Sequence, residues 1–363
     1  MVGKVAPRLH FIVTGGAGFI GSHMVDFLLE NYPASTVTCL DKLSYASHNL
    51  LHNLENAQTH NNFRFEKIDL AESHENIRAI LQRDIDEYDV ITIFNFAAES
   101  CVDQLFDNPI FFTKNNILAT QNVLEAARII IHEHPSYASR IQVVHISTDE
   151  VYGEQGIDEE VDETSPLRPS NPYAATKAAC DLIIEAYVKS YKLNVAIVRA
   201  NNVYGPRQFP EKLIATTLEK LKYANPDSGI EADQRIVIHG DGSHRRRYLH
   251  VRDFVRAVDF VSRNSRKSHN SGEVHNVGTN DECTNKALVE MICRDFMKIV
   301  HGAEIQDFSK FYYFGKDRLY NDSRYSIDTG KMLDLGWSPE VSLADGITEL
   351  IEEVMGIESR QRV

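Results

Sequence analysis

The stretch Leu9–Gly21, LHFIVTGGAGFIG, decides the fold of this chain. Leu9–Thr14 is an apolar, β-prone run, and Gly15, Gly18 and Gly21 follow it immediately before a segment with helical spacing. Glycine permits the tight turn and lets backbone N–H groups approach a phosphate at the positive end of a helix. A strand, a glycine loop and a helix in this order predict the first unit of a dinucleotide-binding sheet.

The first half of the chain repeats this alternation of strand and helix. Strands are expected at Leu9–Thr14, Thr36–Leu40, Phe63–Ile68, Val90–Ala97, Gln142–Ser147 and Val195–Arg199. Helices are expected at His23–Asn31, Ile77–Arg83, Ile117–His132 and Tyr173–Tyr191. Because such alternation forms parallel βαβ units with right-handed crossovers, the predicted fold class is α/β, a Rossmann-type doubly wound parallel sheet.

An acidic residue ends the second expected strand. Asp41 lies 20 residues beyond Gly21, where a carboxylate can bind both hydroxyls of an adenine ribose and would repel a 2′-phosphate. NAD is therefore expected as the cofactor rather than NADP. Lys42 and Ser44 would lie beside the same ribose, and Asp69 after the third strand is a candidate for the adenine amine. An Asp after a strand is also a common helix cap, so both interpretations of Asp69 stay open.

The regular alternation of strand and helix patterns ends after about residue 203, which predicts a smaller lobe. A helix is expected at Leu213–Tyr223 and a strand at Arg235–His239, whereas Glu273–Val277 is expected to return to the main sheet. The expected domains are an NAD-binding Rossmann domain and a smaller α/β substrate lobe. The former comprises residues 8–203 with a returning segment 248–281, and the latter residues 204–247 and 282–355. The polar segments 225–234 and 263–271 indicate no function.

Composition excludes several classes of function. The chain has 363 residues, of which 43% are hydrophobic and 25% charged, as is ordinary for a globular protein of about two domains. Its formal net charge of −14 disfavours nucleic acid and anionic membrane surfaces as partners. The five cysteines are odd in number and lack a C-x-x-C pair, so neither a disulfide framework nor a metal site is expected. Without a long apolar run or a signal-peptide layout, a cytoplasmic protein is expected.

Two motifs carry the chemistry. The segment Ser147–Tyr152, STDEVY, precedes a Tyr173-x-x-x-Lys177 pair by 21 positions. A Tyr and a Lys four apart share one helix face, so the ammonium is expected to lower the phenol pKa towards that of a working base. Asp149 and Glu150 add an acid and a base, which elimination needs and simple alcohol oxidation does not. Each motif alone has an ordinary alternative, as a helix cap or a solvated pair.

An ordered series of motifs resembles the extended short-chain dehydrogenase/reductase family, specifically the nucleoside-diphosphate-glucose 4,6-dehydratases. The resemblance extends from about Leu9 to Trp337. Its motifs are TGGAGFIGSH from Thr14, DKLSYA from Asp41, AAES from Ala97, STDEVYG from Ser147, NPYAATKAA from Asn171, YGPRQFPEKL from Tyr204, GDGSHRRRYLHV from Gly240, NVGTNDE from Asn276, DRLYNDSRYSID from Asp317 and LGW from Leu335. This many motifs in one order make chance agreement negligible.

The resemblance implies an order of events on a sugar nucleotide. Tyr173 would take the proton from O4 while C4 gives hydride to NAD, and Lys177 would hold the nicotinamide ribose. The C4 ketone acidifies the C5 proton, which Glu150 would remove. A protonated Asp149 would then release the C6 hydroxyl as water, and Thr148 would hydrogen-bond O4. Hydride returns to C6 and C5 is reprotonated, so the net reaction is dehydration with NAD regenerated.

The resemblance also implies two sets of binding residues and a partner. The cofactor would contact Gly15, Gly18, Phe19, Ile20, Gly21, Asp41, Lys42, Leu43, Ser44, Asp69, Leu70, Ala97, Ala98, Glu99, Ser100, Asn115, Tyr173, Lys177 and Val203. The sugar nucleotide would contact Ser100, Thr148, Asn202, Lys212, Leu213, Arg246, Asn276, Asp317, Arg318 and Tyr325. Helices Ile117–His132 and Tyr173–Tyr191 would form the four-helix bundle of a homodimer, unless their apolar faces only pack on the sheet.

The chain departs from the family pattern at several positions. Cys101 stands where bacterial members carry His, Gln104 replaces an Arg, and Arg247 replaces an acidic residue; within Arg245–Arg247, only Arg246 is expected to enter the pocket. The family's DRPGHD reads DRLYND from Asp317, and Ala215-Thr216-Thr217 replaces a Pro-Leu-Val wall. UDP-glucose and dTDP-glucose therefore both stay open as substrate. A 4-epimerase, a UDP-glucuronate decarboxylase and a catalytically silent NAD-binding regulator are the alternative functions.

Overall fold

Seven parallel strands form the central sheet. The structure is a computed structural model that describes residues 6–44, 47, 51–100, 108–268, 271–317 and 320–357. The strand order is β10-β6-β5-β4-β1-β2-β3, and every neighbouring pair is parallel. The strands are β1 (Leu9–Thr14), β2 (Thr36–Asp41), β3 (Phe63–Lys67), β4 (Val90–Asn95), β5 (Ile141–Thr148), β6 (Val195–Ala200) and β10 (Glu273–Val277). The predicted doubly wound α/β class is confirmed.

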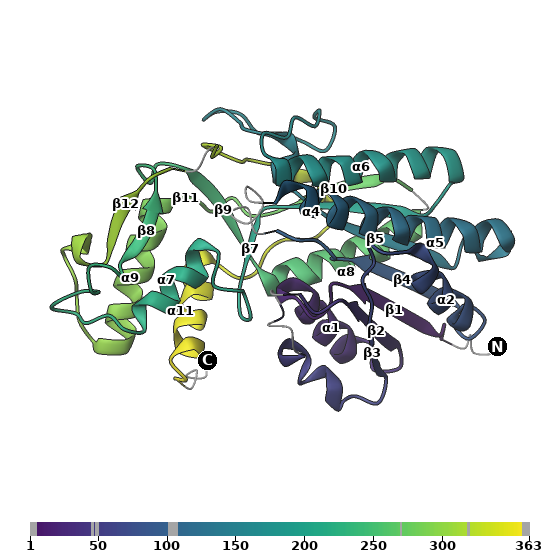
Figure 1. Ribbon diagram of the computed structural model, residues 1–363, viewed down its shortest axis with the longest axis horizontal. Coiled ribbons are helices and arrows are strands. Elements are labelled where there is room, and N and C mark those ends of the chain that lie inside the picture. The colour runs from purple at the N-terminus through teal and green to yellow at the C-terminus, as the bar shows by residue number, and fades with distance from the viewer. Residues whose placement is uncertain are drawn as a thin grey trace.

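Helices cover both faces of this sheet (Figure 1). One face carries α1 (Phe19–Asn31) and α8 (Val251–Ser268), and the other carries α2 (His74–Asp84), α5 (Ala119–Glu133) and α6 (Pro172–Tyr191). Strand β1 explains the two layers, because successive side chains of a strand point to opposite faces. Phe11 and Val13 join the core under α1 and α8, whereas Ile12 joins the core under α2, α5 and α6. The polar segment from residue 263 begins as the last turns of α8.

The helix expected from residue 117 begins earlier and changes type along its length. The short helix α4 (Pro109–Thr113) leads into a π-helical turn (Lys114–Leu118), from which α5 continues. This turn buries the side chains of Asn115 and Asn116, and π-helical turns occur often at functional positions. Single 3₁₀ turns lie at His52–Leu54, Ala57–Thr59, Pro135–Tyr137, Asp149–Tyr152 and Phe308–Lys310.

Most of the remaining elements gather at one end of the sheet and form the lobe seen on the left of Figure 1. The strands are β7 (Asn202–Tyr204), β8 (Ile236–His239), β9 (Arg245–His250), β11 (Glu282–Thr284) and β12 (Tyr312–Gly315). They pair as a three-stranded sheet β11-β9-β7 and a two-stranded sheet β12-β8. The lobe's helices are α7 (Leu213–Leu221), α9 (Asn285–His301) and α11 (Leu343–Val354), whereas the short helix α10 (Gly330–Asp334) packs beside β10, where Met332 joins the core of the main sheet. Within the described residues, no helix has the length and apolar character that crossing a membrane requires.

Candidate active site

A cavity of about 440 Å³ lies between the glycine loop of the main sheet and the smaller lobe. It contains most of the residues that the sequence singled out. The expected residues that line it are Gly15, Gly18, Phe19, Ile20, Gly21, Asp41, Lys42, Ser44, Asp69, Leu70, Ala97, Ala98, Glu99, Ser100, Asn115, Thr148, Glu150, Tyr173, Lys177, Asn202, Val203, Lys212, Leu213, Arg246 and Tyr325. Residues far apart in the chain therefore meet around one space.

The glycine loop at one end of the cavity has no room for side chains. A Cβ on Gly21 would lie 2.2 Å from the carbonyl oxygen of Gly15, and Gly15 itself has a φ of +65°. Gly18 is the N-cap of α1 and brings no side-chain oxygen to the first-turn N–H groups, which leaves them available to an anion. Asp41 accepts hydrogen bonds from the N–H groups of Ala17 at 3.0 Å and Leu43 at 2.7 Å. This arrangement can hold a dinucleotide.

Three further expected cofactor residues have partners within the protein. Lys42 Nζ lies 3.1 Å from Glu99 Oε1 and donates to Asn115 Oδ1 at 2.5 Å. Asp69 lines the cavity, and its Oδ1 also accepts from the N–H of Ala71 at 2.9 Å within a turn, whereas the N-cap of α2 is Ser73. The Leu43 side chain does not line the cavity; it packs against the hydrophobic core.

The STDEVY motif forms the end of β5 and the 3₁₀ turn after it. Thr148 caps this turn, because its Oγ1 accepts from the N–H of Glu150 at 3.3 Å. Glu150 faces the cavity, and its Oε2 accepts from Asn171 Nδ2 at 3.0 Å. Asp149 is 3% exposed and does not line the cavity. Asn201 Nδ2 donates to Asp149 Oδ2 at 2.9 Å, and Thr148 Oγ1 donates to Oδ1 at 3.2 Å.

These different surroundings separate the two adjacent carboxyls. Burial raises the pKa of Asp149 to about 7, and the neighbouring charge of Glu150 acts in the same direction. The hydrogen bonds from Asn201 and Thr148 oppose this rise in pKa, because they favour the charged carboxylate. At neutral pH Asp149 is therefore partly protonated, as a general acid must be, while Glu150 presents a hydrogen-bonded carboxyl to the cavity.

The Tyr-x-x-x-Lys pair is arranged differently from the prediction. Both side chains line the cavity, but Lys177 Nζ donates to the carbonyl of Ile146, and burial lowers its pKa. Burial raises the pKa of the Tyr173 phenol well above its ordinary value, and the charges of Glu150 and Asp149 raise it further. The prediction that Lys177 lowers this pKa is wrong for the arrangement seen, because burial has the largest effect on the phenol pKa and the neighbouring charges raise it further.

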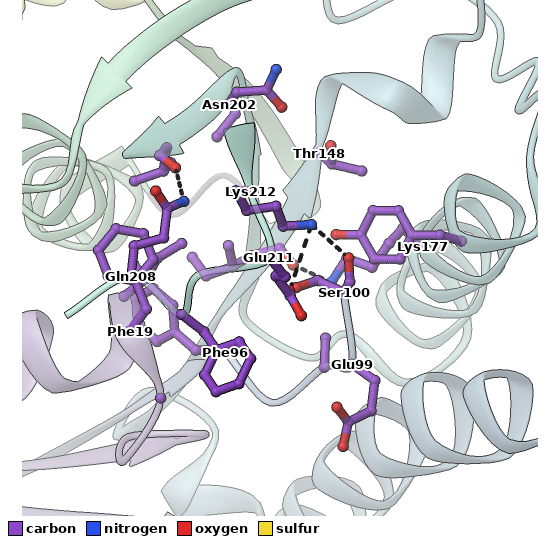
Figure 2. A pocket seen from close by; sticks show the side chains of 18 of the residues that line it. Phe19, Phe96, Glu99, Ser100, Thr148, Lys177, Asn202, Gln208, Glu211 and Lys212 are labelled. Atoms are coloured by element: carbon purple, nitrogen blue, oxygen red, sulfur yellow. Dashed lines mark hydrogen bonds and ion pairs between the residues drawn. The ribbon is translucent and has the colours of Figure 1, made fainter. Parts of the chain in front are cut away.

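Lys212 crosses the middle of the cavity, as Figure 2 shows. Its Nζ donates to the carbonyl of Ser100 at 2.8 Å and lies 3.8 Å from Glu211 Oε1. Phe19 and Gln208 lie on one side of it, and Thr148 and Lys177 on the other (Figure 2). Lys212 thus places a cation between the glycine loop and the acid–base residues.

Of the consecutive arginines 245–247, all of them described, only Arg246 lines the cavity. Its guanidinium lies 4.6 Å from the centre of the Tyr325 ring and donates to Asn321 Oδ1 at 3.2 Å. Arg247 is buried on the other side, where it pairs with Glu160 at 2.7 Å. At position 247, where the family pattern has an acidic residue, this chain therefore has an arginine with its own carboxylate partner.

Comparison with known proteins agrees with this geometry. Residues 12–350 match the family described as GDP-mannose 4,6 dehydratase. The chain belongs to this family. It is 46% identical to an uncharacterised Schizosaccharomyces pombe protein, over 94% of this chain and 96% of that one.

Two further dehydratase relatives carry named activities. A trifunctional UDP-glucose 4,6-dehydratase/UDP-4-keto-6-deoxy-D-glucose 3,5-epimerase/UDP-4-keto-L-rhamnose-reductase of Arabidopsis thaliana is 37% identical over 94% of this chain, which spans 46% of the plant protein. The structure of the dTDP-glucose 4,6-dehydratase DesIV of Streptomyces venezuelae, solved with NAD bound, superposes with a TM-score of 0.79 at 36% identity. The superposition covers 96% of this chain and 97% of that one. UDP-sugar and dTDP-sugar enzymes thus both occur among its relatives.

Several expected residues of this dehydratase-family chain are not at the cavity. Asn276 is fully buried, where its Oδ1 accepts from the Tyr152 hydroxyl at 2.8 Å and its Nδ2 donates to the Val161 carbonyl at 3.2 Å. Asp317 is exposed and accepts from Asn321 Nδ2 at 3.1 Å. Neither side chain supports the expected substrate contact. Arg318, Cys101 and Gln104 lie outside the described residues.

Sequence reasoning missed other residues of the cavity wall. Asn171, Asn201, Glu211 and Asp322 line it. Asn171, Glu211 and Asp322 lie within motifs of the dehydratase family and Asn201 precedes the expected residue Asn202, so their position was a usable signal. Tyr248 also lines it and lies within the motif that begins at Gly240, whereas Val237, His239 and Asn285 lie outside the quoted motifs and gave no such signal. Among the described residues, no cluster of His, Cys, Asp and Glu side chains has an arrangement suited to a metal ion.

Proposed function

We propose that this protein is an NAD-dependent hydro-lyase that converts UDP-glucose or dTDP-glucose to the 4-keto-6-deoxy-glucose nucleotide. The observation that carries the proposal is the contrast between two adjacent carboxyls. Asp149 is buried with a pKa of about 7, and Glu150 faces the cavity. Elimination across C5–C6 needs an acid and a base at the same pH. Relatives solved with NAD bound, together with the glycine loop and Asp41, support NAD as the cofactor.

NAD, when bound, supplies the hydride acceptor and later the donor. The glycine loop and Asp41 hold the dinucleotide, and Tyr173 with Lys177 exchanges the proton of the sugar O4. For Tyr173 to act as a base its pKa must fall. Protonation of Asp149 contributes to this fall, because it removes one of the two negative charges that raise the phenol pKa. The acid and the redox pair are therefore coupled through charge.

Glu150 then removes the C5 proton, since it is the acid–base carboxyl that faces the cavity. Asp149 holds the proton that the departing C6 hydroxyl needs, and Thr148, which is hydrogen-bonded to Asp149, lines the cavity beside it. Lys212 and Arg246 bring two positive charges to the same cavity, where they bind the diphosphate. On this assignment residues 8–203 with 248–281 form the cofactor domain, and residues 204–247 with 282–355 the substrate lobe.

The products of UDP-glucose and dTDP-glucose, offered together with NAD, test the proposal. Mass spectrometry should show the loss of one water from at least one nucleotide, without net consumption of NAD. An unchanged mass with inverted C4 would identify an epimerase instead. Loss of carbon dioxide in a parallel incubation with UDP-glucuronate would identify a decarboxylase. NAD binding without conversion of any substrate would favour the remaining alternative, a catalytically silent NAD-binding regulator.

A single substitution links the reaction to its proposed base. Glu150→Gln should still bind NAD and exchange hydride at C4, but dehydration should slow by about a hundredfold or more because the C5 proton has no acceptor. Glu159→Gln is the matched control, since this exposed carboxylate lies in a loop, where it accepts from the N–H of Gly156, and does not line the cavity. Undiminished dehydration by the Glu150 variant would remove Glu150 from the mechanism.

We also propose a cytoplasmic homodimer that pairs through α5 and α6. These helices bury apolar residues against the sheet and also expose others, as a helix does that packs on two sides. On α6, Ile184 is fully buried whereas Leu182 is 56% exposed. The four cysteines within the described residues are free thiols, in keeping with a reducing compartment. Light scattering tests the dimer: Leu182→Asp should yield monomers, and unchanged dimers would contradict this interface.

A further inference from the structure

The phenol of Tyr325 lies between two carboxylates at the wall of the cavity. The Tyr325 hydroxyl lies 3.5 Å from Glu150 Oε2 and makes a short hydrogen bond to Asp322 Oδ2. All three residues line the cavity, and Asp322 and Tyr325 are almost completely buried. Asp322 Oδ1 is also buried and has no hydrogen-bond partner among the described residues. Nothing in the reaction as proposed above uses Asp322.

A phenol has one proton to donate, so it can satisfy only one of the two carboxylates. While Tyr325 donates to Asp322, a lone pair of its oxygen faces Glu150. That contact becomes favourable when Glu150 carries a proton and donates it to the phenol oxygen. This is the state that Glu150 reaches after it has removed a proton from the substrate. The geometry therefore provides a continuous hydrogen-bonded chain at that stage of the reaction.

Two consecutive residues bind the two ends of this chain, and one of them, Ser170, extends it away from the cavity. Ser170 Oγ donates to Asp322 Oδ2 at 2.6 Å, and Asn171 Nδ2 donates to Glu150 Oε2 at 3.0 Å. Ser170 is partly exposed and does not line the cavity. One end of the chain is thus the proposed base and the other is the hydroxyl of the partly exposed Ser170.

We propose that Tyr325, Asp322 and Ser170 form a proton relay that connects Glu150 with solvent. In the first step the Glu150 O–H bond breaks as the Tyr325 oxygen gains that proton, while the original Tyr325 proton passes to Asp322 Oδ2. One proton has then moved from Glu150 to Asp322, the negative charge has moved the other way, and no electrons are transferred. In the second step the Ser170 hydroxyl turns its own proton towards water, the Asp322 Oδ2–H bond breaks as Ser170 Oγ gains that proton, and the original Ser170 proton passes to water.

The relay rests on the proposed function and adds a property to it. Without a relay, Glu150 would keep the C5 proton in the closed cavity and return it to C5. With the relay, that proton mixes with solvent before C5 is reprotonated. The Arg246 guanidinium over the Tyr325 ring supports the transfer, because it stabilises negative charge that develops on the phenol oxygen. Asp322 is thus a positioning and relay residue, which acts through Tyr325 and not on the sugar itself.

The test measures solvent hydrogen at C5 per turnover. Wild-type protein, NAD and unlabelled UDP-glucose or dTDP-glucose are incubated in deuterated water, and the product is reduced at once with borohydride to stop exchange beside the ketone. The measured ratio is the amount of deuterium at C5 divided by the amount of water lost, which is the incorporation per turnover. We expect substantial incorporation in the wild type and about tenfold less per turnover in Asp322→Asn, whose amide accepts hydrogen bonds but cannot carry the proton.

Two further variants make the result decisive. Tyr325→Phe breaks the chain without changing Asp322, and should lower the same ratio even if Asp322→Asn does not fold. Asp328→Asn is the matched control, because this exposed residue of the same segment accepts from the N–H of Gly330 and does not line the cavity. It should leave the ratio unchanged.

The possible failures are distinguishable. A purely structural role of Asp322 would lower dehydration and incorporation together, and the constant ratio would overturn the relay. Absence of C5 deuterium in wild-type product would overturn it too. Absence of dehydration by the wild type would instead refute the proposed function itself.

Discussion

Asn171 connects Glu150 to α6, the helix that carries Tyr173. Its Oδ1 accepts from the N–H of Ala174 and caps α6, while its Nδ2 donates to Glu150 Oε2 at 3.0 Å. Both functions of the amide fix its orientation, so the position of Glu150 depends on the first turn of α6. The proposed base for C5 and the proposed base for O4 are thereby held by one side chain.

Replacement of Asn171 by Asp should separate these two functions. Asn and Asp are comparable N-caps, so thermal unfolding should change little. Asp cannot donate to Glu150 and adds a negative charge beside it, and kcat should therefore fall by about tenfold to a hundredfold. Ser342→Ala serves as the reverse control, because it removes the N-cap of α11 away from the cavity and should lower stability by about 1 kcal/mol with kcat intact. An unchanged kcat in Asn171→Asp would show that this contact is dispensable.

The pH dependence of kcat should report on Asp149. With its pKa raised by burial to about 7, the protonated fraction falls as the pH rises through neutrality, and kcat should fall with it. Asn201→Ala removes a hydrogen bond that favours the charged carboxylate. The pKa of Asp149 should therefore rise, and the decline of kcat should move to higher pH. Asn62→Ala, in a distant loop, should leave the profile in place, whereas a shift to lower pH in Asn201→Ala would contradict the assignment.

Binding of NAD should depend on the absence of a Cβ at position 21. Gly21→Ala would bring a methyl group 2.2 Å from the carbonyl oxygen of Gly15, so the loop must open and the affinity measured by calorimetry should fall by about tenfold or more. Gly302→Ala is the control, because Gly302 has a similarly positive φ of +65° with nothing within 4 Å of the added Cβ. That variant should lose some stability but bind NAD normally. Equal affinities for both variants would contradict a role of the loop in binding NAD.

Arg246 should determine affinity for the sugar nucleotide more than the rate of chemistry. Arg246→Lys keeps the charge but loses the planar fork that binds two phosphate oxygens, so KM should rise by about tenfold while kcat stays within a small factor. Arg245→Lys, at an exposed neighbour that pairs with Glu282, should change neither. A fall in kcat with KM unchanged would place Arg246 in the chemical step instead.

The main sheet and the glycine loop were predictable because their signals are local. The run Leu9–Thr14 and the glycines after it specify strand, turn and helix without reference to the rest of the chain. The strand Glu273–Val277 was also recognised from its own pattern and lies beside β6 in the sheet. Helices α9 and α11 were not predicted, because their packing partners in the smaller lobe could not be identified from the sequence.

The parts of the site that escaped prediction depend on contacts between distant segments. The amide of Asn276 has Tyr152 as its partner, and spacing in the sequence does not reveal that contact. The pKa of Tyr173 was predicted from its own helix, yet burial and the charges at the end of β5 decide it. Asp322 lies within a family motif, but its role was not predicted because its partners, Ser170 and Tyr325, are assembled only by folding.

The place of β10 at the edge of the sheet has a consequence for synthesis of the chain. Strand β6 ends at Ala200, but its neighbour β10 begins only at Glu273, so the ribosome must make the intervening residues before that edge is covered. Until then the buried strand β6 presents unpaired backbone groups, and such edges pair readily with other chains. Nascent chains that stall before Glu273 should therefore need chaperones more than those that have passed Val277.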